Sequence, residues 1–141
     1  MCKLLLTAFL ITFISCNRYN AQWAPDHYWA AKTWELKKMK GEKSDMKNVA
    51  LQFDWAGKKF RSSCGCNEID GKYELIDKKN IRFASLSSTG NCTSMPFEKE
   101  FIETLKKVDS YEIEGDNMLL KSDKKVVMIF SGKEIPAVAR K

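Results

Sequence analysis

The segment VALQFDWAGKKFRSSC, residues 49–64, decides the fold class. Val49, Leu51 and Phe53 are spaced two apart, so they share one face of an extended strand. The letters DWAG that follow are turn residues, and residues 59–64 return with a similar short period. This spacing predicts an antiparallel β-hairpin.

Short β segments continue on both sides of the hairpin. They are separated by turn residues rather than by helices, so the strands are expected to pair in antiparallel fashion. The expected strands are residues 33–36, 72–76, 81–83, 111–113, 118–121 and 126–130, and the expected turns are residues 69–71, 114–117 and 122–124.

One segment has a helical period. Its apolar residues are Phe97, Phe101, Ile102, Leu105 and Val108, which form one stripe on a helix. Pro96 suits a first helical turn, so the pattern predicts a helix over 96–108 that buries this stripe in the core.

These elements predict a mainly β fold with one packed helix, that is, a β-rich α+β domain. Its form is expected to be a curved antiparallel sheet or a small lipocalin-like barrel. The residues expected to point inward and fill the barrel are Leu51, Phe53, Phe83, Leu119 and Phe130.

Composition excludes several classes of protein. The 141 residues suit one domain, and 44% hydrophobic residues with 7 Gly and 3 Pro exclude a disordered or fibrous chain. His27 is the single histidine, and no Gly-rich phosphate loop occurs. The net charge of +6 comes from lysines spread along the chain, which indicates a solvated surface and no nucleic-acid partner.

The N-terminus has the pattern of a signal peptide. Lys3 precedes an apolar run over 4–14, which is too short to span a bilayer as a helix. Ser15 and Cys16 then follow as in a bacterial lipobox, in which the cysteine is joined to lipid. We therefore expect a signal peptide over 1–15, and a lipidated N-terminus and tether over 16–31.

Two alternatives for the N-terminus remain open: an ordinary secretory signal cut after Ala21, and an uncleaved anchor. All three interpretations place the domain outside the cytoplasm. The favoured one predicts a protein held in the cell envelope by its lipid, at the outer membrane and facing the periplasm.

The motif Gly65-Cys66-Asn67, followed by Gly71 and Tyr73, resembles the META domain, a family that includes heat-inducible lipoproteins. The similarity continues through Ser88-Thr89 and Cys92 and covers about 32–131, which leaves 132–141 as a polar tail. The resemblance implies a small β-rich domain with a helix, usually outside the cytoplasm and often lipid-anchored. The resemblance does not imply an enzyme, and the family is associated with stress tolerance and envelope function. We expect no catalytic activity, no cofactor and no metal.

Cysteine count allows at most one internal disulfide bond. Cys2 would leave with the signal and Cys16 would carry lipid, so Cys64, Cys66 and Cys92 remain in an oxidising compartment. The favoured pair is Cys66–Cys92. Cys64–Cys92 and no bond at all are the alternatives.

Other chemistry has weaker support. Cys64, Cys66, Cys92 and His27 could be combined into a zinc or copper site, but a CxC pair is a poor start for one. Glu68 and Asp70 could be combined into a hydrolytic carboxylate pair, but both fall in an expected turn. Asn67 and Gly71 are interpreted as turn residues that tolerate positive φ.

Two functional hypotheses remain. The first is a non-catalytic, monomeric envelope lipoprotein that binds a protein or another envelope component. The alternative is a small barrel that carries an apolar ligand, which would need small inward residues rather than the large ones expected here.

Overall fold

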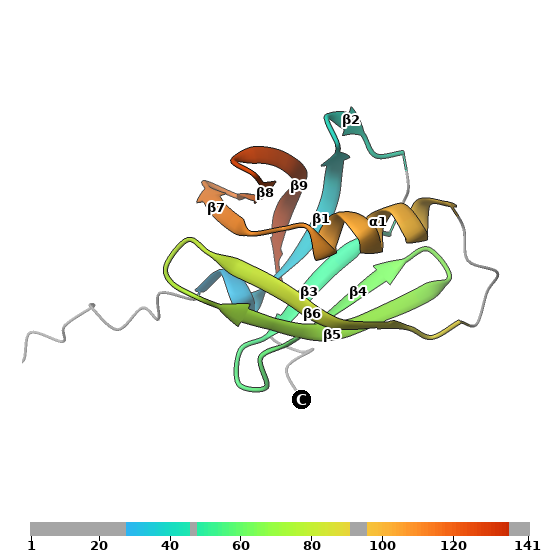
Figure 1. The fold of residues 1–141 in the computed structure, drawn as a ribbon, viewed down its shortest axis with the longest axis horizontal. Coiled ribbons are helices and arrows are strands. Elements are labelled where there is room, and N and C mark those ends of the chain that lie inside the picture. The colour runs from blue at the N-terminus through green and yellow to red at the C-terminus, as the bar shows by residue number, and fades with distance from the viewer. Residues whose placement is uncertain (1–27, 46–47, 91–95, 136–141) are drawn as a thin grey trace, which may run out of the picture.

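The computed structural model describes residues 28–45, 48–90 and 96–135 (Figure 1). Its strands are β1 (Lys32–Met39), β2 (Glu42–Lys43), β3 (Ala50–Asp54), β4 (Lys59–Cys64), β5 (Asn67–Leu75), β6 (Ile81–Ser88), β7 (Ser110–Glu114), β8 (Asn117–Ser122) and β9 (Lys125–Glu134). One 3-10 helix, η2 (Tyr28–Ala31), precedes β1, and one α-helix, α1 (Pro96–Lys106), lies between β6 and β7.

All strands belong to one antiparallel sheet in the order β6-β5-β4-β3-β1-β9-β8-β7, with β2 paired to β1 alone. The sheet curls until its two edges meet at one corner. There Asn80 and Ser110 form an isolated bridge, and the Tyr111 N–H donates to the Lys79 carbonyl at 2.8 Å. The expected fold class, a mainly β domain with a curved antiparallel sheet and one packed helix, is confirmed.

Helix α1 lies across the part of the curled sheet that the edge strands leave open (Figure 1). Phe101 and Leu105 have no exposed surface, whereas Lys99 is exposed. The apolar stripe therefore faces the core, as the helical period predicts. Within the described residues, no helix is both long enough and apolar enough to cross a lipid bilayer.

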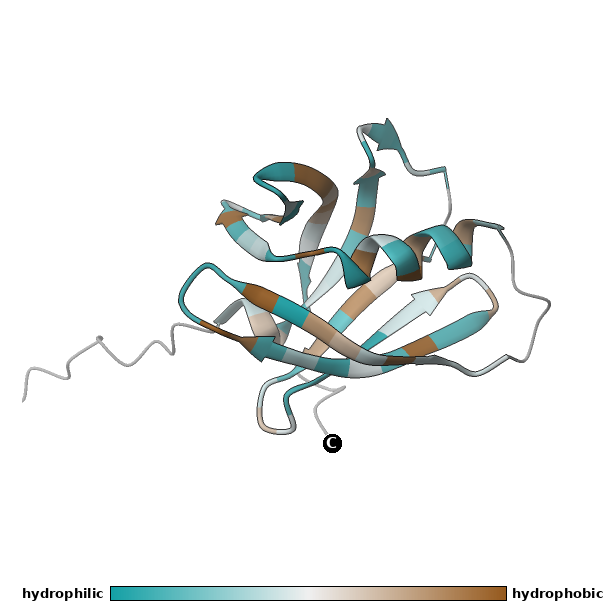
Figure 2. Ribbon diagram, in the orientation of Figure 1, coloured by the Kyte–Doolittle hydropathy of each residue, from teal (hydrophilic) through white to brown (hydrophobic). Residues whose placement is uncertain are grey.

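Alternation along the strands divides core from surface, and Figure 2 shows it as short changes between hydrophobic and hydrophilic residues. Leu51, Phe53, Phe83 and Phe130 are buried as expected. Leu119 is not: its neighbours Met118 and Leu120 fill the core, and Leu119 is only partly buried. Three consecutive apolar residues fit either phase of the alternation, and the packed structure selects the other one.

The folded unit extends beyond residues 32–131 at both ends. Residues 28–31 were expected to be tether, but they form η2, in which Trp29 is 1% exposed. The Trp34 indole N–H donates to the Trp29 carbonyl at 2.8 Å and fixes this segment to β1. At the other end, β9 continues through Glu134, so the start of the expected polar tail belongs to the sheet.

The turn expected at residues 69–71 is also wrong. Strand β5 runs without a break through these residues, with a register shift between Asp70 and Lys72. The chain reverses earlier, between β4 and β5, where Gly65 has a φ of +72°.

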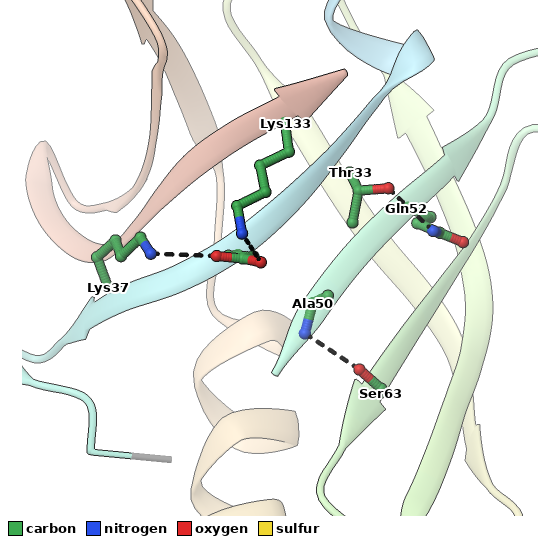
Figure 3. Close-up of polar contacts among 7 residues, drawn as sticks. Thr33, Lys37, Ala50, Gln52, Ser63 and Lys133 are labelled. Carbon is green, nitrogen blue, oxygen red and sulfur yellow. Dashed lines mark hydrogen bonds and ion pairs between the residues drawn. The ribbon is translucent and has the colours of Figure 1, made fainter. Parts of the chain in front are cut away.

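The outer face of β1 and its neighbours is polar (Figure 3). Glu35 accepts from the ammonium groups of both Lys37 and Lys133, and Gln52 donates to the Thr33 hydroxyl at 3.0 Å. These contacts lower the pKa of Glu35, with the hydrogen bond from Lys133 as the largest cause. Because these groups lie at the surface and are partly or fully exposed, their contacts are expected to contribute little to stability.

Candidate functional site

A pocket of about 720 Å³ opens where the β3–β4 turn meets the end of β5. Its lining includes the aromatic side chains Trp55, Tyr73 and Tyr111, together with Leu75 and the two lysines Lys58 and Lys78. Glu74 and Asp77 complete the lining, so four aromatic or aliphatic side chains stand beside two lysines and two carboxylates. A concave apolar site with a few placed polar groups is the usual form of a binding site.

A second pocket of about 600 Å³ adjoins the first and shares Asp77, Lys78 and Tyr111 with it. Its lining adds Tyr28 and the lysines Lys79, Lys121 and Lys124. The two pockets therefore form one continuous surface, at the corner where the sheet edges meet.

A cluster of aromatic rings supports the floor of this surface. Tyr73 is 3% exposed and packs edge-on against Phe53, with ring centroids 5.1 Å apart. Trp29 contacts Phe53 at 4.8 Å and Tyr111 at 5.2 Å. Edge-to-face and tilted contacts of this kind are favourable arrangements of aromatic rings, so the rings of the floor support one another.

Burial raises the pKa of Tyr73 to about 12, with smaller contributions from Asp54 and Tyr111. The phenol is therefore neutral at pH 7. Tyr73 can offer a hydroxyl and an apolar ring, but it is a poor candidate for a general base or a nucleophile at that pH.

The Lys58 ammonium lies 2.8 Å from the centroid of the Trp55 ring. A cation over an aromatic face is attracted by the ring's quadrupole. Partial desolvation lowers the pKa of Lys58. The pair places a positive charge directly beside an exposed indole.

The β5–β6 turn is organised by Asp77. Its carboxylate accepts hydrogen bonds from the backbone N–H groups of Lys79 and Asn80, at 2.8 and 2.9 Å. The Lys79 bond is the largest of the causes that lower the pKa of Asp77. Asp77 forms none of the salt bridges found among the described residues, although the charge of Lys79 contributes to lowering its pKa.

We call this region the aromatic–lysine surface. Its exposed apolar members are Tyr28, Trp55 and Ile76. Its lysines are Lys58, Lys78, Lys79 and Lys124, which take part in none of the salt bridges found among the described residues.

The Gly65-Cys66-Asn67 motif lies elsewhere, under the N-terminal half of α1. Asn67 is 2% exposed, its φ is not positive, and its amide donates to Glu98 at 2.6 Å. Asn67 is therefore a buried contact between sheet and helix, which corrects its interpretation as a turn residue.

Gly71 is not a turn residue either, because it lies within strand β5. It lies opposite Phe60 in the β4–β5 ladder, without a positive φ. A Cβ atom at this position would lie 2.4 Å from Cε1 of Phe60. Glycine is thus required here by close packing. Of the motif residues, only Tyr73 contributes to the aromatic–lysine surface.

The structure describes two of the three cysteines that follow the predicted signal peptide and lipidation site. Cys64 is a free, buried thiol, and Cys66 is disulfide-bonded. Cys92 lies outside the described residues, as do Cys16, Ala21 and His27. The Cys66–Cys92 pairing and the lipidation of Cys16 therefore stay predictions.

Burial raises the pKa of Cys64 to about 11, and the nearby charge of Glu98 adds to the effect. Cys64 is therefore a neutral thiol at pH 7, inert in character. Among the described residues, no three His, Cys, Asp or Glu side chains gather as a metal site would require.

Sequence reasoning treated aromatic residues mainly as core and did not identify the aromatic–lysine surface. Trp55, Leu75 and Tyr111 come from three different turns and strands, and they line one pocket only because the sheet curls. The one available indication was local: Trp55 lies in the expected turn over 54–57, and Lys58 follows it directly.

Comparison with solved structures supports the fold. A DUF4847 family protein from Bacteroides vulgatus ATCC 8482 aligns with a TM-score of 0.59 and 19% identity, over 78% of this chain and 98% of that one. A protein from Burkholderia xenovorans solved by NMR aligns with a TM-score of 0.58 and 20% identity, over 77% and 86%. No curated protein sequence matches the chain.

The sequence model of the META domain matches residues 27–135. This range includes η2 and ends one residue after β9, so its limits agree with those of the folded unit. The motif residues Gly65, Cys66, Asn67, Gly71 and Tyr73 all fall within it. The chain belongs to the META domain family.

Proposed function

We propose that the protein is a non-catalytic, lipid-anchored protein of the cell envelope that binds a partner through its aromatic–lysine surface. The observation that carries this proposal is the clustering of exposed apolar groups. Tyr28, Trp55 and Ile76 are three of the four large hydrophobic side chains exposed in the described part of the chain. Trp55 lines the first pocket and Tyr28 the second, and Ile76 stands in the sequence between the pocket residues Leu75 and Asp77. Such clusters mark interaction sites.

Membership of the META domain family supports a non-catalytic envelope protein and, at most, an association with envelope lipoproteins. The neutral states of Tyr73 and Cys64 at pH 7 agree with a binding role, because neither group is activated for chemistry. A monomer anchored through Cys16 at the outer membrane, and a role in stress response, belong to the same proposal.

An apolar ligand inside the barrel is less well supported. Trp34, Leu51 and Phe130 are fully buried and occupy the interior. An apolar ligand would therefore have to bind in the pocket beside Trp55, where Leu75 and Tyr111 contribute the walls.

The binding role is tested by capture from envelope extracts. The chain from Asn17 to Lys141 is immobilised, and both proteins and lipid-soluble components that it retains are quantified. Trp55→Ala is expected to lose the retained component. Val126→Ala is the matched control, because Val126 is 39% exposed, close to the 37% of Trp55, but lies outside both pockets. Equal retention by the two variants would remove the surface from the proposal.

The anchor is tested separately. Cys16→Ala is expected to abolish lipid labelling and to leave the precursor uncleaved by the lipoprotein signal peptidase. If processing of the wild type is insensitive to globomycin, cleavage near Ala21 is the better interpretation.

A further inference from the structure

We infer that the partner of the aromatic–lysine surface is the anionic surface of a lipid bilayer, on which the domain docks. This inference rests on the proposed function and names the envelope component that the surface binds. Two observations carry it, the kinds of side chain and their charge, and the predicted lipid anchor adds an argument from position.

The exposed side chains are of the kinds that favour a membrane interface. Tyr28 and Trp55 each combine an apolar ring with a polar group, and such rings are enriched at the level of lipid headgroups. Trp55 lies in the β3–β4 turn and Ile76 in the β5–β6 turn, so both are carried by turns. Tyr28 is 52% exposed and Ile76 is 55% exposed, which leaves them available to contact the bilayer.

The charge of the surface complements anionic headgroups. Lys58, Lys78, Lys79 and Lys124 surround the pockets and take part in none of the salt bridges among the described residues. The linings of the two pockets together hold five lysines and three carboxylates, which leaves a net charge of +2. Asp77 caps its own turn, Glu112 pairs with Lys121, and Glu74 lies 3.9 Å from Arg82. Lysines near a membrane are attracted by its negative surface potential.

The position of the surface fits an anchored domain. Tyr28 is the first described residue and lines the second pocket. The predicted lipidation site, Cys16, precedes it by twelve residues, and a chain of that length spans about 40 Å at most. Lipidation at Cys16 would therefore keep this end of the domain close to the membrane. At such a high effective concentration, weak docking is sufficient.

The test separates docking from anchoring. The chain from Asn17 to Lys141 lacks the lipidated cysteine but keeps every core residue from Trp29 to Phe130, so it retains the whole described fold. Its binding is measured by co-sedimentation with vesicles of phosphatidylcholine alone and with vesicles that contain about 30% phosphatidylglycerol. We expect about tenfold tighter binding to the anionic vesicles at 0.1 M salt, and loss of most of that difference at 0.5 M.

Two pairs of charge reversals give the decisive comparison. Lys78→Glu with Lys79→Glu is expected to abolish the preference for anionic vesicles. Lys38→Glu with Lys43→Glu makes the same charge change at an exposed cross-strand pair of β1 and β2, at the far end of β1 from Tyr28 (Figure 1). This control is expected to keep most of the binding, and circular dichroism checks that each variant is folded.

Each outcome decides the inference. No binding to anionic vesicles, or equal weakening by the two double variants, overturns docking on a bilayer. If the surface then still captures an envelope protein that Trp55→Ala loses, the proposed function stands without this inference. Equal, salt-insensitive binding to both kinds of vesicle also overturns the inference, because the apolar side chains alone would then drive the binding and the anionic headgroups would not be recognised.

Discussion

The side-chain amide of Asn67 donates a hydrogen bond to the carboxylate of Glu98, with Nδ2 2.6 Å from Oε2. Asn67 is the first residue of β5, and Glu98 lies in the first turn of α1; they are 2% and 4% exposed. The Ser88 hydroxyl donates to the other oxygen of Glu98, also at 2.6 Å. The carboxylate thus joins α1 to β5 and β6. Asn67, the last residue of the Gly65-Cys66-Asn67 motif, therefore helps to hold the helix on the sheet.

Removal of Asn67 should destabilise the fold strongly. Asn67→Ala leaves the buried carboxylate of Glu98 with one donor fewer, and we expect a loss of about 2–3 kcal/mol in the free energy of unfolding. Urea unfolding of Asn67→Ala, Glu98→Ala and the double variant measures the coupling between the two residues. The control is Gln52→Ala, which removes an exposed bond to Thr33 and should cost less than about 0.5 kcal/mol. Additive losses for Asn67 and Glu98 would contradict the contact.

The stripe of α1 can be tested as core. Phe101 has no exposed surface, so Phe101→Ala should lower the free energy of unfolding by about 3–5 kcal/mol. Lys99→Ala, on the exposed face, should change it by less than about 0.5 kcal/mol. If the Phe101→Ala domain melts at the wild-type temperature, the stripe is not what holds α1 on the sheet.

Periodicity was a good guide where apolar and polar residues alternate. Residues 59–64 were expected to form a strand and match β4, and the helix begins at Pro96 as expected. The same rule failed at Leu119, where three consecutive apolar residues leave the phase undetermined. Strand existence was therefore predictable, while the inward face of β8 was not.

Tertiary contacts were beyond the reach of local patterns. Asn residues and Asp-Gly pairs are typical of turns, so Asn67 and Gly71 were both interpreted as turn residues. Asn67 instead bonds to Glu98, which lies 31 residues further along the chain, and Gly71 packs against Phe60 on the neighbouring strand. Trp29 was likewise placed in a tether, because nothing in its neighbourhood indicates that Trp34 and Phe53 enclose it.

Gly71→Ala tests the close packing at β5. The added methyl group would lie 2.4 and 2.7 Å from two ring atoms of Phe60, so the ring must move. We expect a loss of about 1–3 kcal/mol in stability, measured by thermal unfolding. Phe60→Leu should relieve the clash, so the double variant should be more stable than the sum of the two single losses predicts. Strict additivity would show that Phe60 is not the cause.

The disulfide prediction concerns Cys66 and Cys92. Cys66→Ser should cost about 2–4 kcal/mol under oxidising conditions and should make stability independent of reductant. Cys92→Ser should have the same effect, and combining the two should add nothing. If Cys64→Ser instead reproduces the loss and Cys66→Ser does not, the bond is Cys64–Cys92.

Alkaline pH should weaken the fold through Cys64. Burial raises the pKa of this thiol to about 11, whereas a cysteine in the unfolded chain titrates near 9. Between these values the unfolded state has already lost the proton that the folded state keeps. The free energy of unfolding must therefore fall as pH rises through this window, by up to about 2–3 kcal/mol.

The measurement is urea unfolding of the chain from Asn17 to Lys141 at pH 8, 9, 10 and 11 without reductant, so that the disulfide bond of Cys66 stays intact. Thiol labelling of each unfolded wild-type sample checks that one free thiol remains. Cys64→Ala should show a smaller fall than the wild type across this range, whatever its absolute stability. Tyr73, whose pKa is raised to about 12, adds a fall that begins near pH 10, and Tyr73→Phe removes that part alone. Parallel curves for the wild type and Cys64→Ala would show that Cys64 is not held as a buried neutral thiol beside Glu98.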